Sequence, residues 1–92
     1  MPRFLVEVPH ESNQLACARA VDVFLKTGSH FFTHADWGCR DGEHKAWAIV
    51  EVDTREEALA IVPSGFRAQA KAVQLNAFSI DEIDAFLRQY ED

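Results

Sequence analysis

HFFTHADWGC (residues 30–39) and HKAWAIVEVD (residues 44–53) are the two runs that decide the fold, and the turn RDGE (residues 40–43) separates them. In much of each run, successive side chains alternate between two kinds, and this period of two residues is that of a β-strand with two different faces. Asp-Gly between two such runs is a strong signal for a tight turn. The sequence therefore predicts a β-hairpin with Asp41 and Gly42 at its centre.

Two further strands are expected on either side of this hairpin. Residues 4–8 alternate apolar and polar side chains until Pro9, and residues 72–78 alternate in the same way. Both runs are short and bounded by residues that end strands. The chain is therefore expected to supply four strands.

Three helices are expected between and after these strands. Residues 13–26 carry apolar side chains at helical spacing, with Ser12 as the expected N-cap and Gly28 as the stop. TREE (54–57) and SIDE (79–82) are capping boxes, in which a hydroxyl and a glutamate cap the first turn. They predict a short helix to about residue 62 and a final helix to about residue 90.

The order of these elements predicts an α+β fold. Strand, helix, strand, strand, helix, strand is the ferredoxin-like βαββαβ order, here followed by a C-terminal helix. We expect a four-stranded antiparallel sheet in the order 4-1-3-2, with helices on one face. The 92 residues are expected to form a single domain, residues 1–92.

The register of the hairpin divides its side chains between two faces. Trp37 lies opposite Ala46 in this register, and opposed residues point to the same face. The face expected under the helices is small and apolar and carries Phe31, Thr33, Ala35, Ala46, Ala48, Val50 and Val52, joined by Phe4, Val6, Val8, Val73 and Leu75.

The opposite face mixes large apolar side chains with ionisable ones. Its expected members are His30, Phe32, His34, Asp36, Lys45, Trp47, Ile49, Glu51, Arg3, Leu5, Glu7, Gln74 and Asn76. The βαββαβ core has no helix on this side, and an apolar patch of this size does not stay exposed in a soluble protein. Either the last helix or a second subunit is expected to cover it.

This layout resembles the dimeric α+β barrel superfamily, in which two ferredoxin-like sheets pack face to face. The closest likeness is to small muconolactone-isomerase-like and uncharacterised members. It rests on the acidic strand end EVD (51–53), the helix from Thr54, and the loop from Pro63 to Phe66. The resemblance implies a homodimer through the uncovered sheet face. It carries over no functional residue, because function does not follow from fold.

Composition excludes several classes of partner. The formal net charge is -6, and the nine Lys and Arg residues are scattered. Binding to nucleic acid or to an anionic membrane needs a basic patch, so neither partner is expected. We expect a cytoplasmic protein without a leader or a membrane span, in which Cys17 and Cys39 are free thiols.

Acid–base chemistry on a small, often aromatic, molecule is the expected activity if the protein is an enzyme. His34 would be the proton shuttle, and Asp36 or Glu51 the second acid–base group. The substrate-binding residues would be Trp47 and Phe32 as an apolar wall, with Arg3 and Glu7. Glu7 and Glu51 are expected on adjacent parallel strands, where paired carboxylates would raise each other's pKa.

Metal binding is an alternative. His34 and Asp36 are two residues apart on one strand, roughly 6.6 Å by the strand rise, so they could converge on one ion. Cys39 and His44 oppose each other near the turn and form a separate possibility. No motif fixes a ligand set, so no metal ligand and no cofactor is assigned.

Nucleophilic catalysis is the weakest of these interpretations. Cys39 beside His44 could form a thiolate–imidazolium pair, but the turn offers no evident set of oxyanion donors. Cys17 is interpreted as a packing residue of the first helix and His10 as a loop residue.

The sequence thus favours a small-molecule-binding homodimer, with a cofactor-independent, isomerase-like activity in a cleft on the sheet face. The alternatives are a non-enzymatic homodimeric domain and a metal-binding protein with His and Asp ligands. Substrate and reaction stay open, because no pattern in the chain names them.

Overall fold

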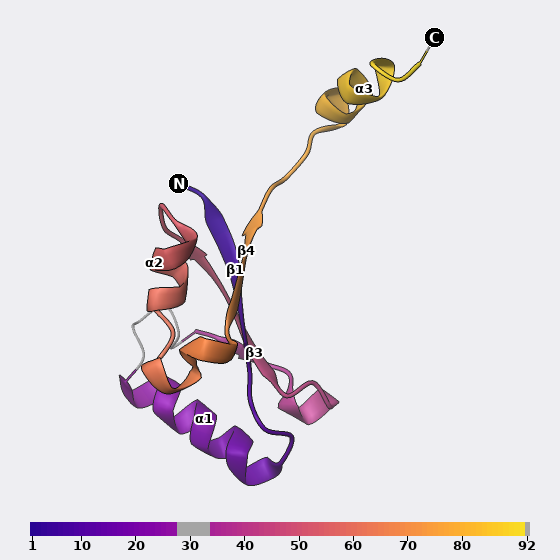
Figure 1. The fold of residues 1–92 in the computed structure, drawn as a ribbon. Helices are drawn as coiled ribbons and strands as arrows, with labels where there is room; N and C mark the ends of the chain where they lie inside the picture. The colour runs from indigo at the N-terminus through magenta and orange to yellow at the C-terminus, as the bar shows by residue number, and fades with distance from the viewer. Residues whose placement is uncertain (28–33, 92) are drawn as a thin grey trace.

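The structure of the protein is a computed structural model, which describes residues 1–27 and 34–91. It is an α+β fold built on one open, four-stranded antiparallel sheet (Figure 1). The strands are β1 (Arg3–Pro9), β2 (Asp36–Trp37), β3 (Lys45–Glu51) and β4 (Lys71–Leu75). The helices are α1 (Gln14–Thr27), α2 (Arg55–Ala60) and α3 (Ile80–Arg88), with short 3₁₀ helices at Cys39–Asp41 and Ser64–Gln69.

The strands lie in the order β2-β3-β1-β4, which is the expected order 4-1-3-2 counted from the opposite edge of the sheet. In the hairpin Trp37 pairs with Ala46, as the sequence predicts. β1 runs antiparallel to β3 and to β4, with Val6 opposite Ala48 and Ala72. β1 and β3 are therefore the two central strands.

The core lies between one face of this sheet and the first two helices. Alternate residues of β1 and β3 are buried, and Phe24 of α1 and Ala58 and Val62 in or close to α2 join them in one cluster. The edge of the Phe24 ring meets the rings of Trp37 and Phe66, with centroids 5.1 and 5.4 Å away. Both helices therefore cover the same face, as expected.

The register of the last strand differs from the prediction. Ala72 faces the core, whereas Val73 pairs with Leu5 and Leu75 with Arg3 on the opposite face. The expectation that Val73 and Leu75 join the core was therefore wrong by one residue. Alternation alone gives this strand two equivalent registers, and the pairing with β1 selects one of them.

The hairpin turn is longer than the expected two-residue turn. Cys39–Asp41 forms a 3₁₀ turn, and Gly42 adopts a positive φ of 85° before the chain enters β3. The amide of Gly38 still donates to the carbonyl of Lys45, at 3.1 Å. The loop changes while the predicted register is kept.

Helix capping follows the sequence in two of three places. Thr54 and Ser79 each accept a hydrogen bond from the amide three residues on, at 3.1 Å. In α1 the cap is Asn13, whose side chain accepts from the amide of Ala16 at 2.7 Å, and not Ser12. Asn and Ser are equally good caps, so sequence alone does not choose between neighbours.

The second half of α1 carries a solvent-exposed ion pair between Asp22 and Lys26, with a 2.9 Å contact. The hydrogen bond from Lys26 to Asp22, together with the charge of that carboxylate, raises the pKa of Lys26. Such exposed pairs at i,i+4 add little to stability. The pair takes no part in the sites described below.

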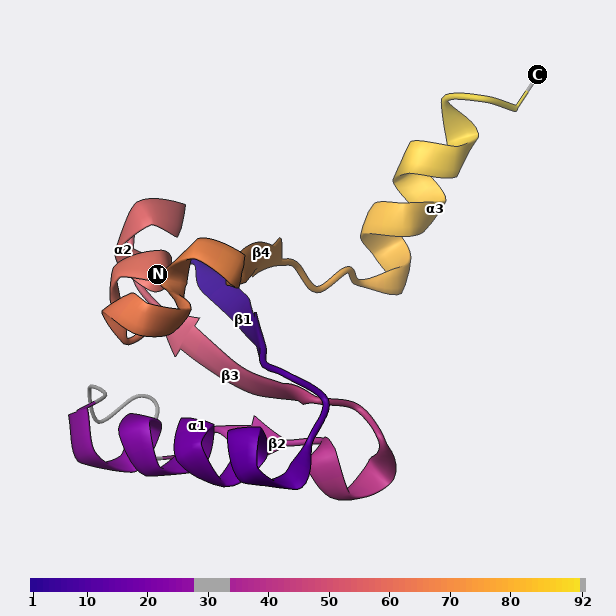
Figure 2. The same cartoon turned by 60° about the horizontal axis from the view of Figure 1, so that its bottom comes forward.

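The last helix stands away from the rest of the molecule. An extended segment after β4 carries α3 beyond the end of the sheet (Figures 1 and 2). Its apolar side chains are solvent-exposed, namely Ile80, Ile83, Phe86 and Leu87, with Phe78 before it and Tyr90 after it. α3 therefore does not cover the sheet of its own chain.

The predicted strand from His30 to Cys39 is only partly described. His30, Phe31, Phe32 and Thr33 lie outside the described residues, and the ladder to β3 is described for Asp36–Trp37. No helix among residues 1–27 and 34–91 is long and apolar enough to cross a membrane.

Candidate functional site

The face of the sheet turned away from α1 and α2, here called the open face, has an apolar centre. Leu5 of β1 lies between Ile49 of β3 and Val73 of β4. Ile49 is 59% exposed and Val73 is 41% exposed. Large apolar side chains at the middle of a sheet are normally covered, so this face has the character of a contact surface.

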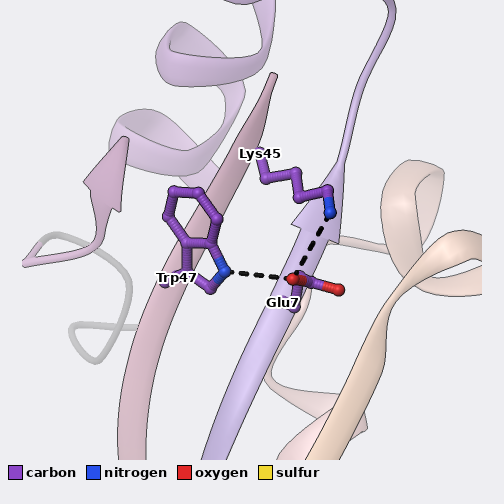
Figure 3. Close-up of polar contacts among 3 residues, drawn as sticks. All are labelled: Glu7, Lys45 and Trp47. Atoms are coloured by element: carbon purple, nitrogen blue, oxygen red, sulfur yellow. Dashed lines mark hydrogen bonds and ion pairs between the residues drawn. The ribbon is translucent and has the colours of Figure 1, made fainter. Parts of the chain in front are cut away.

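A polar group borders this apolar centre. The indole Nε1 of Trp47 donates to Oε1 of Glu7 at 3.1 Å, and Nζ of Lys45 lies 3.6 Å from the same oxygen (Figure 3). Both contacts use Oε1, so Oε2 has no partner among residues 1–27 and 34–91 and is available to a further donor. Glu7 is only partly exposed, and two neighbours on β3 hold its side chain in place.

Three of the predicted site residues meet in one row across the sheet. Asp36 pairs with Trp47, and Trp47 pairs with Glu7. Lys71 on β4 completes the row on the far side of Glu7. The open face therefore brings together a carboxylate, an indole and a second carboxylate, with Lys45 and Lys71 as the lysines near Glu7.

The other predicted site residues lie elsewhere. Arg3 pairs with Glu51 near the opposite end of β1, and both side chains are exposed. His34 is exposed ahead of β2. Phe32 lies outside the described residues. The expected grouping of His34, Asp36 and Glu51 is thus spread over the length of the sheet.

The expected pairing of Glu7 with Glu51 was wrong. β1 and β3 are antiparallel, and Glu7 faces Trp47 while Glu51 faces Arg3. Trp47 and Glu51 are four positions apart on β3, which is roughly 13 Å at the rise of a strand. The two carboxylates are therefore too far apart to perturb each other through direct contact.

Three cavities of about 400 Å³ are formed by described residues. One lies between α1 and Phe66, one lies against α3, and one is lined by Gln14, Cys17, Ala18, Cys39, Arg40 and His44. None of the three is lined by His34. These three cavities therefore lie away from the predicted proton shuttle.

A second cluster of reactive side chains lies at the start of β3. His10, Cys39 and His44 each present a ligand atom, and these atoms all lie within 4.8 Å of one another. The rings of His10 and His44 meet edge to face at 5.8 Å. Cys39 is joined to Cys17 of α1 by a disulfide, with Cα atoms 6.7 Å apart.

This arrangement corrects one expectation. Cys17 and Cys39 form a disulfide and are not free thiols. His10 lies in the loop after β1, as expected, and also belongs to this cluster. Neither His34 nor Asp36 belongs to a group of three potential metal ligands within the described part of the chain, so the structure offers no support for a His and Asp site.

The sequence held a signal for this cluster that motif spacing does not reveal. Pro9 pairs with Lys45, so the next residue outward on each strand is His10 opposite His44, and the amide of His10 donates to the carbonyl of His44 at 3.0 Å. The register of β1 against β3 predicts this pair once the two strands are known to be antiparallel neighbours.

The chain matches no protein family, and no curated protein or solved structure matches it. Its own residues therefore carry the case for its function.

Proposed function

We propose that this protein is a homodimeric small-molecule-binding domain of the ferredoxin-like, dimeric α+β barrel type. In this arrangement two open faces pack toward each other and enclose a ligand between them. The observation that carries the proposal is the exposed apolar centre formed by Leu5, Ile49 and Val73, bordered by the anchored carboxylate of Glu7.

The properties of α3 support a second copy as the occupant. α3 has nine residues, and isolated helices shorter than ~12–15 residues are marginal in water. Its apolar side is exposed and stands beyond its own sheet (Figure 2). A partner chain that receives α3 would bury this side and would cover the open face at the same time.

The ligand follows from the lining of the open face. Trp47 and Ile49 offer apolar contact, and Oε2 of Glu7 is available as an acceptor. A small molecule with an aromatic or apolar body and one hydrogen-bond donor fits these groups. In the proposed dimer, the acid–base role of His34 would use a cavity that the second copy completes.

Light scattering after size-exclusion chromatography tests the dimer. Ile49→Glu introduces a charge at the centre of the open face and is expected to give a monomer, because two such charges would be desolvated in the interface. Leu25→Glu is the matched control, since Leu25 is 56% exposed on α1 and Ile49 is 59% exposed. A wild-type monomer, or equal behaviour of the two variants, would contradict the proposal.

The two indole N–H signals in an NMR spectrum test the ligand site. Phenol and benzamide, titrated as probes, are expected to shift the signal of Trp47, whose ring lies on the open face, and to leave that of Trp37, which packs on the core side. Glu7→Gln should reduce the shift. Equal shifts of both indoles, or none, would rule out binding at Glu7.

A further inference from the structure

The cluster of His10, Cys39, His44 and Cys17 lies outside the open face and has no part in the function proposed above. It joins three elements, because His10 follows β1, Cys39 and His44 lie in the β2–β3 loop, and Cys17 belongs to α1. Cys17, Cys39 and His44 also line one cavity. Three of these residues have ligand atoms within 4.8 Å of one another, and Cys17 is bonded to one of them, Cys39. Two cysteines and two histidines are a usual ligand set of a structural zinc site.

The hydrogen bond that His10 makes to the backbone is typical of a metal-binding histidine. Its Nδ1 lies 2.9 Å from the carbonyl oxygen of Glu11, and a carbonyl only accepts, so Nδ1 carries the proton. In the neutral ring Nε2 then has a free lone pair, and it lies 3.1 Å from Sγ of Cys39. Histidine ligands commonly donate their second ring N–H to a backbone carbonyl in this way, which fixes the tautomer.

His44 supplies an independent observation. Its Nδ1 is buried and has no hydrogen-bond partner among the described residues. A buried polar atom without a partner costs stability, so its presence calls for an explanation, and a bound ion is one. The ring lies against that of His10, and His44 belongs to the group whose ligand atoms are within 4.8 Å of one another.

The ligand atoms of His10, Cys39 and His44, all within 4.8 Å of one another, lie close to the spacing that a tetrahedral ion requires. Zinc bonds of about 2.0–2.3 Å place neighbouring ligand atoms roughly 3.3–3.8 Å apart. Nε2 of His10 is already 3.1 Å from Sγ of Cys39. Any covalent S–S bond holds its two sulfur atoms closer than this, so cleavage of the bond between Cys17 and Cys39 lets them separate to the spacing that the ion requires.

We propose that Cys17, Cys39, His10 and His44 form a zinc site that is closed by the disulfide and opened by its reduction. A dithiol reductant donates two electrons, breaks the S–S bond and becomes a disulfide itself, while its two protons pass to Cys17 and Cys39. Zn²⁺ then replaces the two thiol protons, which are released to solvent. In the reverse step a small-molecule disulfide accepts two electrons from the two thiolates, takes two protons from solvent and leaves as two thiols, while the S–S bond between Cys17 and Cys39 forms again. This expels the ion, because disulfide sulfur atoms carry no charge and bind zinc weakly.

Metal titration of the full chain tests this site. The reduced protein, freed of reductant, is expected to bind one equivalent of Zn²⁺, and Co²⁺ is expected to give the intense visible bands of a tetrahedral site with thiolate charge transfer in the near ultraviolet. The oxidised protein should give neither signal. Equal affinity of the two forms, or octahedral Co²⁺ spectra in the reduced form, would overturn the proposal.

Three variants test the proposed ligands, and a fourth is the control. His10→Ala and His44→Ala should each weaken Zn²⁺ binding by at least about tenfold, since even the loss of a group that supports a metal ligand typically costs 10–100-fold in affinity. His34→Ala is the control, because His34 is exposed and lies outside the cluster. Cys17→Ser should lower the Co²⁺ charge-transfer intensity by about half, because one of two thiolates is lost.

Circular dichroism shows whether each variant is folded. A folded variant that binds Zn²⁺ as tightly as the wild type contradicts the assignment of that residue as a ligand. Ile49→Glu separates this site from the proposed dimer. Its Zn²⁺ affinity is expected to equal that of the wild type, and a loss of binding in this variant would refute a site contained within one chain.

Discussion

At the scale of single residues, Gly38 matters because its backbone lies against the ring of Trp47 on the open face and the backbone of the hairpin loop. A Cβ at Gly38 would lie 2.7 Å from Cζ3 of Trp47 and 2.8 Å from the carbonyl oxygen of Glu43. Real Cβ atoms do not approach other atoms so closely, and the Trp47 ring is held by its bond to Glu7. The absence of a side chain at Gly38 therefore allows the indole to lie where it does.

Gly38→Ala is expected to destabilise the protein by about 1–3 kcal/mol, the usual cost of inserting a methyl group into a packed site. Gly65→Ala is the matched control, because the methyl group that alanine adds there would have open space around it and the φ of Gly65 is not positive. Urea unfolding of both variants measures the difference. Equal midpoints would show that Trp47 is free to move aside.

At the scale of the elements, the disulfide ties α1 to the loop that begins β3. Cys17 and Cys39 are 22 residues apart in sequence. Closing a loop of this length stabilises a protein by about 3 kcal/mol through the restricted unfolded chain. For a small domain with a stability of about 5–15 kcal/mol, that is a large share.

Reduction of the disulfide is therefore expected to lower the free energy of unfolding by about 3 kcal/mol in metal-free buffer. Urea unfolding with and without a phosphine reductant measures this, and the Cys17→Ser, Cys39→Ser double variant, which has no disulfide in either buffer, is the control. Equal stability of the oxidised and reduced wild type would mean that the bond does not constrain the chain.

At the scale of the whole molecule, two apolar surfaces stay exposed in the part of the chain that the structure describes. The molecule extends 58 Å along its longest axis, because α3 projects from a body that is otherwise compact (Figure 1). The open face and the apolar side of α3 are the surfaces concerned. A chain of 92 residues buries a limited area of apolar surface when it folds. Contact with a second copy would bury more of this surface and so stabilise the fold further.

Local patterns determined much of this architecture. The alternation in β1 and β3, the caps at Thr54 and Ser79, and the pairing of Trp37 with Ala46 depend on neighbours in sequence or on a short turn. The two faces of the hairpin could therefore be predicted, including the separation of Trp37 from Trp47. The N-cap of α1 and the details of the turn around Gly42 differ because several local solutions have similar free energies.

What only the tertiary structure decided is which distant residues meet. The hairpin at residues 30–53 suggested a site around His34 and Asp36, but antiparallel pairing of β1 with β3 put His10 beside His44 and Trp47 beside Glu7. Packing of α1 against the same face brought Cys17 to Cys39. Such contacts depend on the pairing of strands and the docking of helices far apart in the chain, and local periodicity carries no information about them.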